Sequence, residues 1–156
     1  MAKNDRYSNA AVTDLVLSIF RLNGFFLHAG DRLTAGSGLT TVRWQVLGTV
    51  LHEPLTVAAA ARNAGLTRQS VQRVADALVA EGLCQFLPNP AHRRAKLLCS
   101  TDRGLKAVRH LSPRVTAWSE RVRELVGDST LNAATVAVKN LLSAITDVRV
   151  QLLDDA

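Results

Sequence analysis

The feature that most constrains this 156-residue chain is the stretch from Leu55 to Thr101, which contains two short helical patterns joined at a glycine. At the junction, Gly65 can adopt the left-handed backbone conformation that ends a helix, and Thr67 can cap the helix that follows. Beyond this cap, apolar residues recur at helical spacing, at Val71, Val74, Ala75 and Leu78. The sequence therefore predicts a helix-turn-helix whose second helix packs along one face.

The other face of this second helix is polar and rich in arginine and glutamine. Near the helix N-terminus it carries Thr67, Arg68, Gln69, Ser70, Gln72 and Arg73. Guanidinium and amide groups form bidentate hydrogen bonds with guanine and adenine edges in the major groove, so these side chains suit base recognition. The alternative is an amphipathic surface helix with solvated charges, and the segment after the helix favours the first interpretation.

A basic β-hairpin is predicted directly after the second helix. Two apolar-rich runs, residues 83–87 and 96–100, flank a loop that contains two prolines and no apolar side chain larger than these. Arg93 and Arg94 lie in this loop, and Lys96 lies at its end. Such a wing can contact the sugar-phosphate backbone or the narrow minor groove, where arginine is favoured. For these residues taken alone, a solvated loop is the alternative.

The positive charge of the chain is concentrated in the same region. The whole chain has a net charge of +6, and residues 55–115 contain ten Lys or Arg against three acids, so this segment has a net charge of +7. A basic middle between nearly neutral flanks indicates a polyanionic partner and salt-dependent binding. Membrane surfaces are also anionic, but these basic residues do not follow one long amphipathic helix with bulky aromatics opposite.

Apolar seams with alternating spacings of three and four flank the basic region and predict long helices. The first seam consists of Val12, Leu15, Ile19, Leu22, Phe26, Ala29 and Leu33, and the second of Leu131, Ala134, Val138, Leu141, Ile145, Val148 and Leu152. We expect a single domain, 1–156, with dimerisation helices at 9–33 and 112–153 around a winged part at 39–110. The alternative is that each seam closes the core of one chain. The expected fold class is mainly α with a small antiparallel β-hairpin wing.

Five motifs in this order resemble the multiple-antibiotic-resistance regulator (MarR) family. They are LTTVRWQVL at 39–47, ARNAGLTRQSV at 61–71, GL at 82–83, RRAKL at 93–97 and STDRG at 100–104. The resemblance implies a winged helix-turn-helix transcriptional regulator, usually a homodimeric repressor that a small molecule or oxidant releases from DNA. The family commonly carries an Asp two residues before the arginine at the tip of the wing, and here His92 precedes Arg94 at that spacing.

A twofold-symmetric dimer would read a near-palindromic operator with half-sites about 10 bp apart, centre to centre. The resemblance also implies an effector pocket between the terminal helices and the winged part. The candidate pocket residues are Phe25, Phe26, His28, Trp44 and Trp118, and the expected ligand is an apolar or phenolic anion. Packing in the core is the alternative for each of these side chains.

Two cysteines, Cys84 and Cys99, are equally far from the loop centre, which predicts that they lie roughly opposite each other on the wing strands. They are either a redox switch or two small buried apolar side chains, and a reducing cytosol favours the second interpretation. By the resemblance, peroxide-sensing members keep a reactive cysteine in the first helix, where this chain has none. The four histidines show no paired spacing, so we expect neither a metal nor a cofactor.

An enzyme is one alternative to a DNA-binding protein. The chain has no Gly-rich phosphate loop, no Gly-x-Ser-x-Gly elbow and no His-Glu-x-x-His helix, so we expect no catalytic residues. A winged-helix module for protein contacts is the other alternative, and it would predict more apolar anchors and fewer arginines. Asp14, Arg21 and Asn23 interrupt the early apolar region, which predicts a cytoplasmic protein with no membrane partner.

Overall fold

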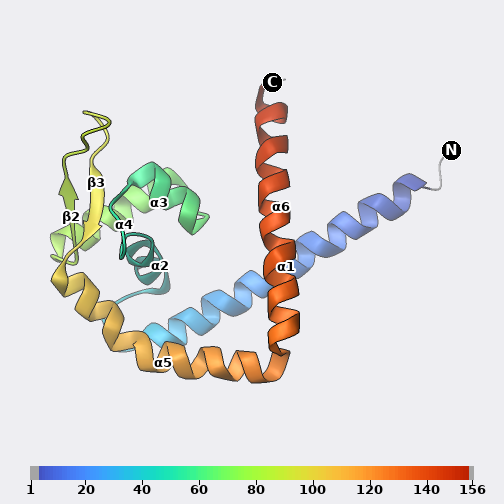
Figure 1. Cartoon of the computed structure of the whole chain (residues 1–156), viewed down its shortest axis with the longest axis horizontal. Coiled ribbons are helices and arrows are strands. Elements are labelled where there is room, and N and C mark those ends of the chain that lie inside the picture. Colours follow the sequence, from blue (N-terminus) through green and yellow to red (C-terminus); the bar gives the residue numbers. More distant parts are fainter. Residues whose placement is uncertain (1–3, 155–156) are drawn as a thin grey trace. The chain divides into compact units, whose positions relative to one another are not determined.

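The computed structural model describes the backbone of residues 4–154 and the burial of side chains in residues 10–145. In chain order, its elements are α1 (Asn4–Thr34), α2 (Thr41–Thr49), β1 (Leu55–Thr56), α3 (Val57–Ala64), α4 (Arg68–Ala80), β2 (Cys84–Leu87), β3 (Leu97–Ser100), α5 (Asp102–Val126) and α6 (Asp128–Asp154) (Figure 1). The chain forms two compact units, Met1–Ser112 and Pro113–Ala156. The first unit contains the three strands found among the described residues and the predicted helix-turn-helix.

The core of the first unit lies where α2, α3 and α4 pack against one another and where α4 packs against β2. Its largest fully buried side chains include Leu47 from α2, Leu78 from α4 and Leu98 from β3. Burying a leucine contributes about 1.5–3 kcal/mol, so this junction of helices and sheet is what fixes α4 on the unit. The predicted fold class, mainly helical with a small antiparallel wing, is confirmed.

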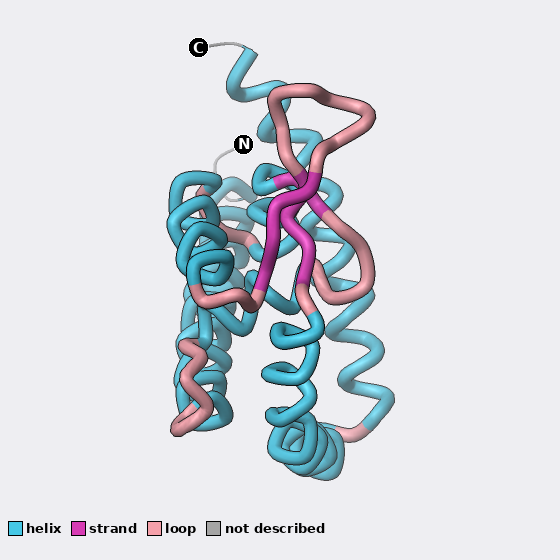
Figure 2. Tube along the Cα trace, turned by 90° about the vertical axis from the view of Figure 1, so that its left-hand side faces the viewer, coloured by secondary structure: helices cyan, strands magenta, loops and turns pink. Residues whose placement is uncertain are grey.

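The sheet is antiparallel and has the strand order β1-β3-β2. Strands β2 and β3 form the predicted hairpin, and the long loop between them extends beyond the strands (Figure 2). Strand β1 was not predicted, because two residues are too short to show an alternating pattern. It pairs Leu55 with Leu98 and Thr56 with Leu97, and therefore joins the start of α3 to the wing.

Helix α5 begins after Thr101, and the Thr101 hydroxyl accepts a hydrogen bond from the Gly104 N–H at 3.1 Å. It ends before Gly127, whose φ of 81° lies in the left-handed region. Pro113 lies inside this helix and does not interrupt it.

Both predicted seams lie on helices and stay largely exposed in the single chain. On α1, Val12, Ile19 and Leu22 are exposed over 43–58% of their surface. On α6, Val138 and Ile145 are also exposed, whereas the side chains of Val148 and Leu152 lie outside the described residues. What covers the two seams, a second copy or the rest of the same chain, stays a prediction.

Helix α1 is apolar enough to be compared with a membrane-spanning helix. Within the described residues, Ala10–Thr34 is one helix that could cross a membrane by length and composition alone. Its most apolar stretch has a mean hydropathy of 1.5, and none of this stretch is buried in the structure. Asp14, Arg21 and Asn23 therefore do not make this helix too polar to meet the length and hydropathy criteria of a membrane-spanning helix. A helix that buries its apolar face against another helix has the same composition.

Candidate nucleic-acid interface

The turn between α3 and α4 has the geometry that the sequence predicts. Gly65 ends α3 with φ 65° and ψ 29°, in the left-handed region that favours glycine. Thr67 is the N-cap of α4, and its hydroxyl accepts a hydrogen bond from the Ser70 N–H at 3.1 Å. Substituting such a cap by alanine typically costs about 0.5–2 kcal/mol, so the cap helps to fix the first turn of α4.

Helix α4 is divided into a buried face and an exposed face. Val71, Ala75 and Leu78 are fully buried, and Val74 is half-buried, which confirms the predicted core face. Most of the predicted base-reading side chains are exposed, namely Thr67, Arg68, Gln69, Gln72 and Arg73, while Ser70 is half-buried. The Gln72 amide donates a hydrogen bond to the Asp76 carboxylate at 2.9 Å, which orients this amide on the exposed face.

The loop of the wing is folded by local hydrogen bonds. The Asn89 side chain accepts a hydrogen bond from the Ala91 N–H at 3.0 Å, and the Asn89 carbonyl accepts one from the His92 N–H at 3.2 Å. The His92 carbonyl in turn accepts a hydrogen bond from the Ala95 N–H at 3.1 Å. These turns bring the chain back to β3, and Arg93, Arg94 and Lys96 are exposed as predicted.

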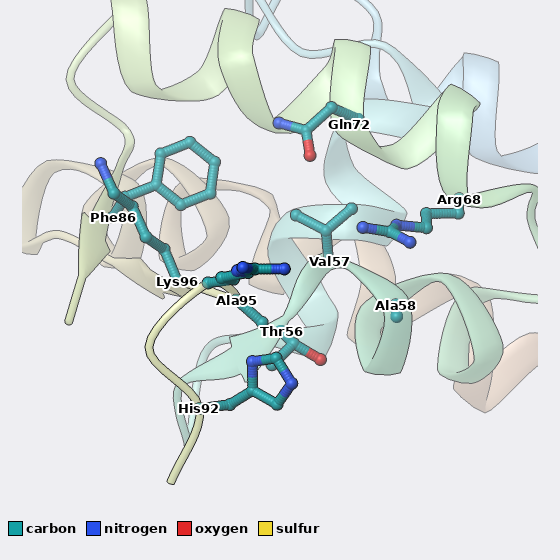
Figure 3. A pocket seen from close by; sticks show the side chains of 10 residues that line it. Thr56, Val57, Ala58, Arg68, Gln72, Phe86, His92, Ala95 and Lys96 are labelled. Atoms are coloured by element: carbon teal, nitrogen blue, oxygen red, sulfur yellow. The ribbon is translucent and has the colours of Figure 1, made fainter. Parts of the chain in front are cut away.

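A cavity of about 530 Å³ lies between the start of α3, the exposed face of α4 and the wing (Figure 3). Ten side chains line it: Thr56, Val57, Ala58, Arg68, Gln72, Phe86, His92, Arg94, Ala95 and Lys96. Three of them are permanent cations, and no acidic side chain is among these ten described residues. The arrangement therefore attracts an anion from solvent.

The cavity combines some of the predicted DNA-binding residues and leaves others outside. Arg68 and Gln72 from α4 line it together with Arg94 and Lys96 from the wing. The predicted residues Thr67, Gln69, Ser70, Arg73 and Arg93 do not line it. The exposed residues thus form two groups, one inside the cavity and one on the remaining surface of α4 and the wing.

Sequence reasoning did not select the residues that form the third wall of the cavity, Thr56, Val57 and Ala58. Thr56 is the N-cap of α3, and its hydroxyl accepts a hydrogen bond from the Ala59 N–H at 3.2 Å. A threonine before the run of alanines at 58–61 is a recognisable capping signal. Phe86 was also missed, since its place on the wall depends on the pairing of β2 with β3.

Helix α2 supports the helix-turn-helix from behind through polar contacts. The Gln45 amide donates a hydrogen bond to the Ala64 carbonyl at 2.8 Å, next to the turn at Gly65. Arg43, whose side chain is largely buried, forms an ion pair with Glu81 at the C-terminal end of α4. Helix α2 therefore contacts both the turn between α3 and α4 and the C-terminal end of α4.

The five effector-pocket candidates lie in different surroundings. Phe25, Phe26 and His28 are exposed on α1, and the two phenyl rings pack edge to face with centroids 6.0 Å apart. Trp44 is half-buried on α2 in the same unit, and Trp118 is half-buried in the second unit. None of the five lines the cavity beside α4. Their role stays a prediction.

The cysteine pair requires a correction. Cys84 is paired with Ser100, and Cys99 is paired with Gln85, so the two cysteines are not directly opposite each other. Because neighbouring positions on a strand face opposite sides of the sheet, this register directs the two side chains to different faces. Cys84 is buried, and burial, followed by the proximity of Cys99, raises the pKa of its thiol to about 12. Such a thiol is a weak nucleophile at neutral pH.

Comparisons with known proteins agree with this geometry. The sequence model of the MarR family matches residues 37–95, which contain α2, α3, α4, β2 and most of the wing loop. The chain is 35% identical over 134 residues to the uncharacterized protein Rv2011c of Mycobacterium tuberculosis, covering 86% of this chain and 94% of that protein. It is 26% identical over 147 residues to the transcriptional activatory protein BadR of Rhodopseudomonas palustris, covering 90% and 81%.

Solved structures share the fold. The structure of CouR from Rhodococcus jostii bound to p-coumaroyl-CoA is similar with a TM-score of 0.73 and 24% identity, covering 83% of this chain and 92% of that one. The transcriptional repressor CouR bound to a 23-mer DNA duplex is similar with a TM-score of 0.69 and 23% identity, covering 80% and 89%. The fold found here therefore occurs in a protein that has been seen with DNA and with a small molecule.

Proposed function

The chain belongs to the MarR family and is a DNA-binding transcriptional regulator, and from this premise we propose that it is a homodimeric repressor of a near-palindromic operator. We further propose that a small aromatic or phenolic effector relieves the repression. Regulators of this family bind DNA rather than catalyse a reaction, and they are soluble, so the proposed location is the cytoplasm. The exposed arginine and glutamine face of α4 beside a cationic wing carries the proposal.

In the proposed complex, α4 lies in the major groove and the wing contacts the flanking backbone. Gln69 and Arg73 are exposed on α4 outside the cavity and are the proposed base readers, since both side chains can form bidentate hydrogen bonds. Thr67, Ser70 and Arg93 are proposed to contact the backbone around them. The winged part at 39–110 thus supplies the DNA contacts of each subunit.

The proposed dimer uses the helices at 9–33 and 112–153. Their exposed apolar seams would be an aggregation hazard in a monomer, and burial against a second copy removes that surface from water. This also accounts for the apolar character of α1 without a membrane. Sedimentation equilibrium is expected to give twice the chain mass of 16.9 kDa, and a stable monomer would contradict the dimer.

The effector proposal rests on the family and on CouR, which has been solved with p-coumaroyl-CoA. Phe25, Phe26, His28, Trp44 and Trp118 are the proposed ligand contacts, with an aromatic acid or its thioester as the ligand. Titration of such compounds is expected to change tryptophan fluorescence and to release DNA. Unchanged signals across a broad panel would contradict it. An activator is the alternative to a repressor, because BadR is named an activatory protein.

The decisive experiment selects fragments of source-genome DNA that the purified protein retains, and then compares variants on the selected operator. Gln69→Ala or Arg73→Ala is expected to relax base preference at the cost of about 1–3 kcal/mol each, the value of one bidentate contact. Arg121→Ala is a charge-matched control, since this exposed residue pairs with Glu124 in the second unit. Failure to retain any duplex at low salt would favour a protein-interaction module instead.

A further inference from the structure

We propose that the cavity between α4 and the wing is a site for one backbone phosphate of the DNA, in which Arg68 acts as a clamp and His92 as a proton-dependent contact. This inference rests on the proposed DNA binding and assigns Arg68 to the phosphate backbone rather than to base edges. It also gives His92 a function in the wing, where it lines the cavity with Arg94 and Lys96.

The side chains that line the cavity favour a phosphate. Arg68 approaches from α4, and Arg94 and Lys96 approach from the wing, so three cations from two separate elements line one space. The Arg68 guanidinium points into the cavity in the close-up view (Figure 3). The anionic oxygens of a backbone phosphate can accept hydrogen bonds from such a group of donors, whereas the edge of a base pair offers few acceptors to three cations at once.

The position of the cavity, beside the start of α3 and the exposed face of α4, also suits a backbone phosphate. Its third wall is the start of α3, where Thr56 caps the helix and the backbone N–H groups of the first turn carry the positive end of the helix dipole. The cavity adjoins the exposed face of α4 that also carries Gln69 and Arg73. With α4 in the major groove, as proposed above, the sugar-phosphate backbone that borders this groove would lie next to the cavity, between α4 and the wing.

His92 makes the site sensitive to pH. Imidazole changes its charge near neutral pH, and the groups that line the cavity with His92 are Arg68, Arg94 and Lys96, with Arg93 next to it in the chain. Asp76 binds Gln72 on α4 and does not line the cavity. A proton on His92 adds a fourth positive charge, which a bound phosphate attracts. Phosphate and proton therefore favour each other's binding, and acidification tightens the complex.

The test measures DNA affinity between pH 5.5 and pH 8 at constant ionic strength. The wild type is expected to bind about tenfold more tightly at the acidic end, equivalent to one strongly coupled proton. His92→Gln is expected to abolish most of this dependence, while His52→Gln, which removes an exposed histidine outside the cavity, should retain it. If His92→Gln keeps the full dependence, the role of His92 is refuted.

A salt titration tests Arg68 separately. Arg68→Ala is expected to weaken all duplexes alike and to lower the slope of log K against log salt by about 1, with base preference unchanged. A change of base preference without a change of slope would refute the clamp. Inorganic phosphate is the probe for a free-ligand site: if it binds the cavity while both variants keep wild-type DNA affinity, the duplex is not the occupant. Absence of DNA binding by the wild type at every pH would refute the proposed function itself.

Discussion

Gly104 fixes the junction between the wing and α5, and its replacement by alanine gives the sharpest stability prediction. A Cβ at this position would lie 2.1 Å from the Leu83 carbonyl oxygen and 3.3 Å from Leu47 Cδ1. Real Cβ atoms essentially never approach closer than 3.0 Å, so the backbone before β2 would have to move by about 1 Å. The Leu83 oxygen also accepts hydrogen bonds from the Thr101 N–H at 3.0 Å and from the Thr101 hydroxyl at 3.1 Å.

The loss of stability that Gly104→Ala causes can be estimated from these contacts. Two weakened hydrogen bonds cost about 1 kcal/mol each, and overpacking adds about 1–3 kcal/mol. The better helix propensity of alanine offsets about 1 kcal/mol. We therefore expect Gly104→Ala to lower the free energy of unfolding by about 2–4 kcal/mol. The shift would also displace the wing, so DNA affinity should fall in the fraction that remains folded.

Urea denaturation followed by tryptophan fluorescence and circular dichroism measures this change. All samples need the same protein concentration, because the stability of a dimer depends on it. Gly48→Ala is the matched control: this glycine lies in α2, and a Cβ there meets nothing within 4 Å. The control is expected to be unchanged or stabilised by up to about 1 kcal/mol. Equal stability of Gly104→Ala and wild type would refute the packing argument.

Three further predictions concern α4, α1 and the thiols. Thr67→Ala should cost about 0.5–2 kcal/mol in urea denaturation because the Ser70 N–H loses its acceptor, and an unchanged midpoint would contradict the cap. Gly30→Ala should destabilise by about 1–3 kcal/mol, since its Cβ would lie 2.5 Å from Thr41 Cγ2, and the double variant with Thr41→Gly should recover part of that loss. With its pKa raised to about 12, Cys84 should react with thiol reagents at pH 8 far more slowly than Cys99, and two equally fast thiols would contradict this. Because the unfolded chain releases that proton near 9, the contribution of Cys84 to stability is intact below pH 9 and is lost as the pH rises towards 12.

The elements that sequence reasoning located are those with local signals. Gly65 and Thr67 mark the end of one helix and the start of the next by their own backbone and side-chain chemistry, and the structure has both as predicted. The buried face of α4 follows from spacing alone, since Val71, Ala75 and Leu78 recur at the helical period. Such features depend on residues within one or two turns of each other. They need no knowledge of the rest of the fold.

The features that were missed depend on pairing between distant residues. Counting from the loop centre places Cys84 opposite Cys99, but the observed register pairs Leu87 with Leu97 and so places Ser100 opposite Cys84. The count differs by a single residue, and a slip of one residue transfers a side chain to the other face of a sheet. Turn geometry sets this register, and a loop with two prolines gives no unique turn type from sequence.

Thr56 shows why the cavity itself was beyond sequence reasoning. It is the last residue of β1, where it pairs with Leu97 at the start of β3, and its hydroxyl caps α3. One residue therefore fixes the start of α3 against the wing, although forty-one positions separate the two partners in the chain. Neither a strand of two residues nor a threonine cap predicts that contact alone. Because both meet at Thr56, main-chain pairing joins the start of α3 to the wing, and side-chain packing joins α3 to α4. Together these contacts bring the three walls of the cavity to one place.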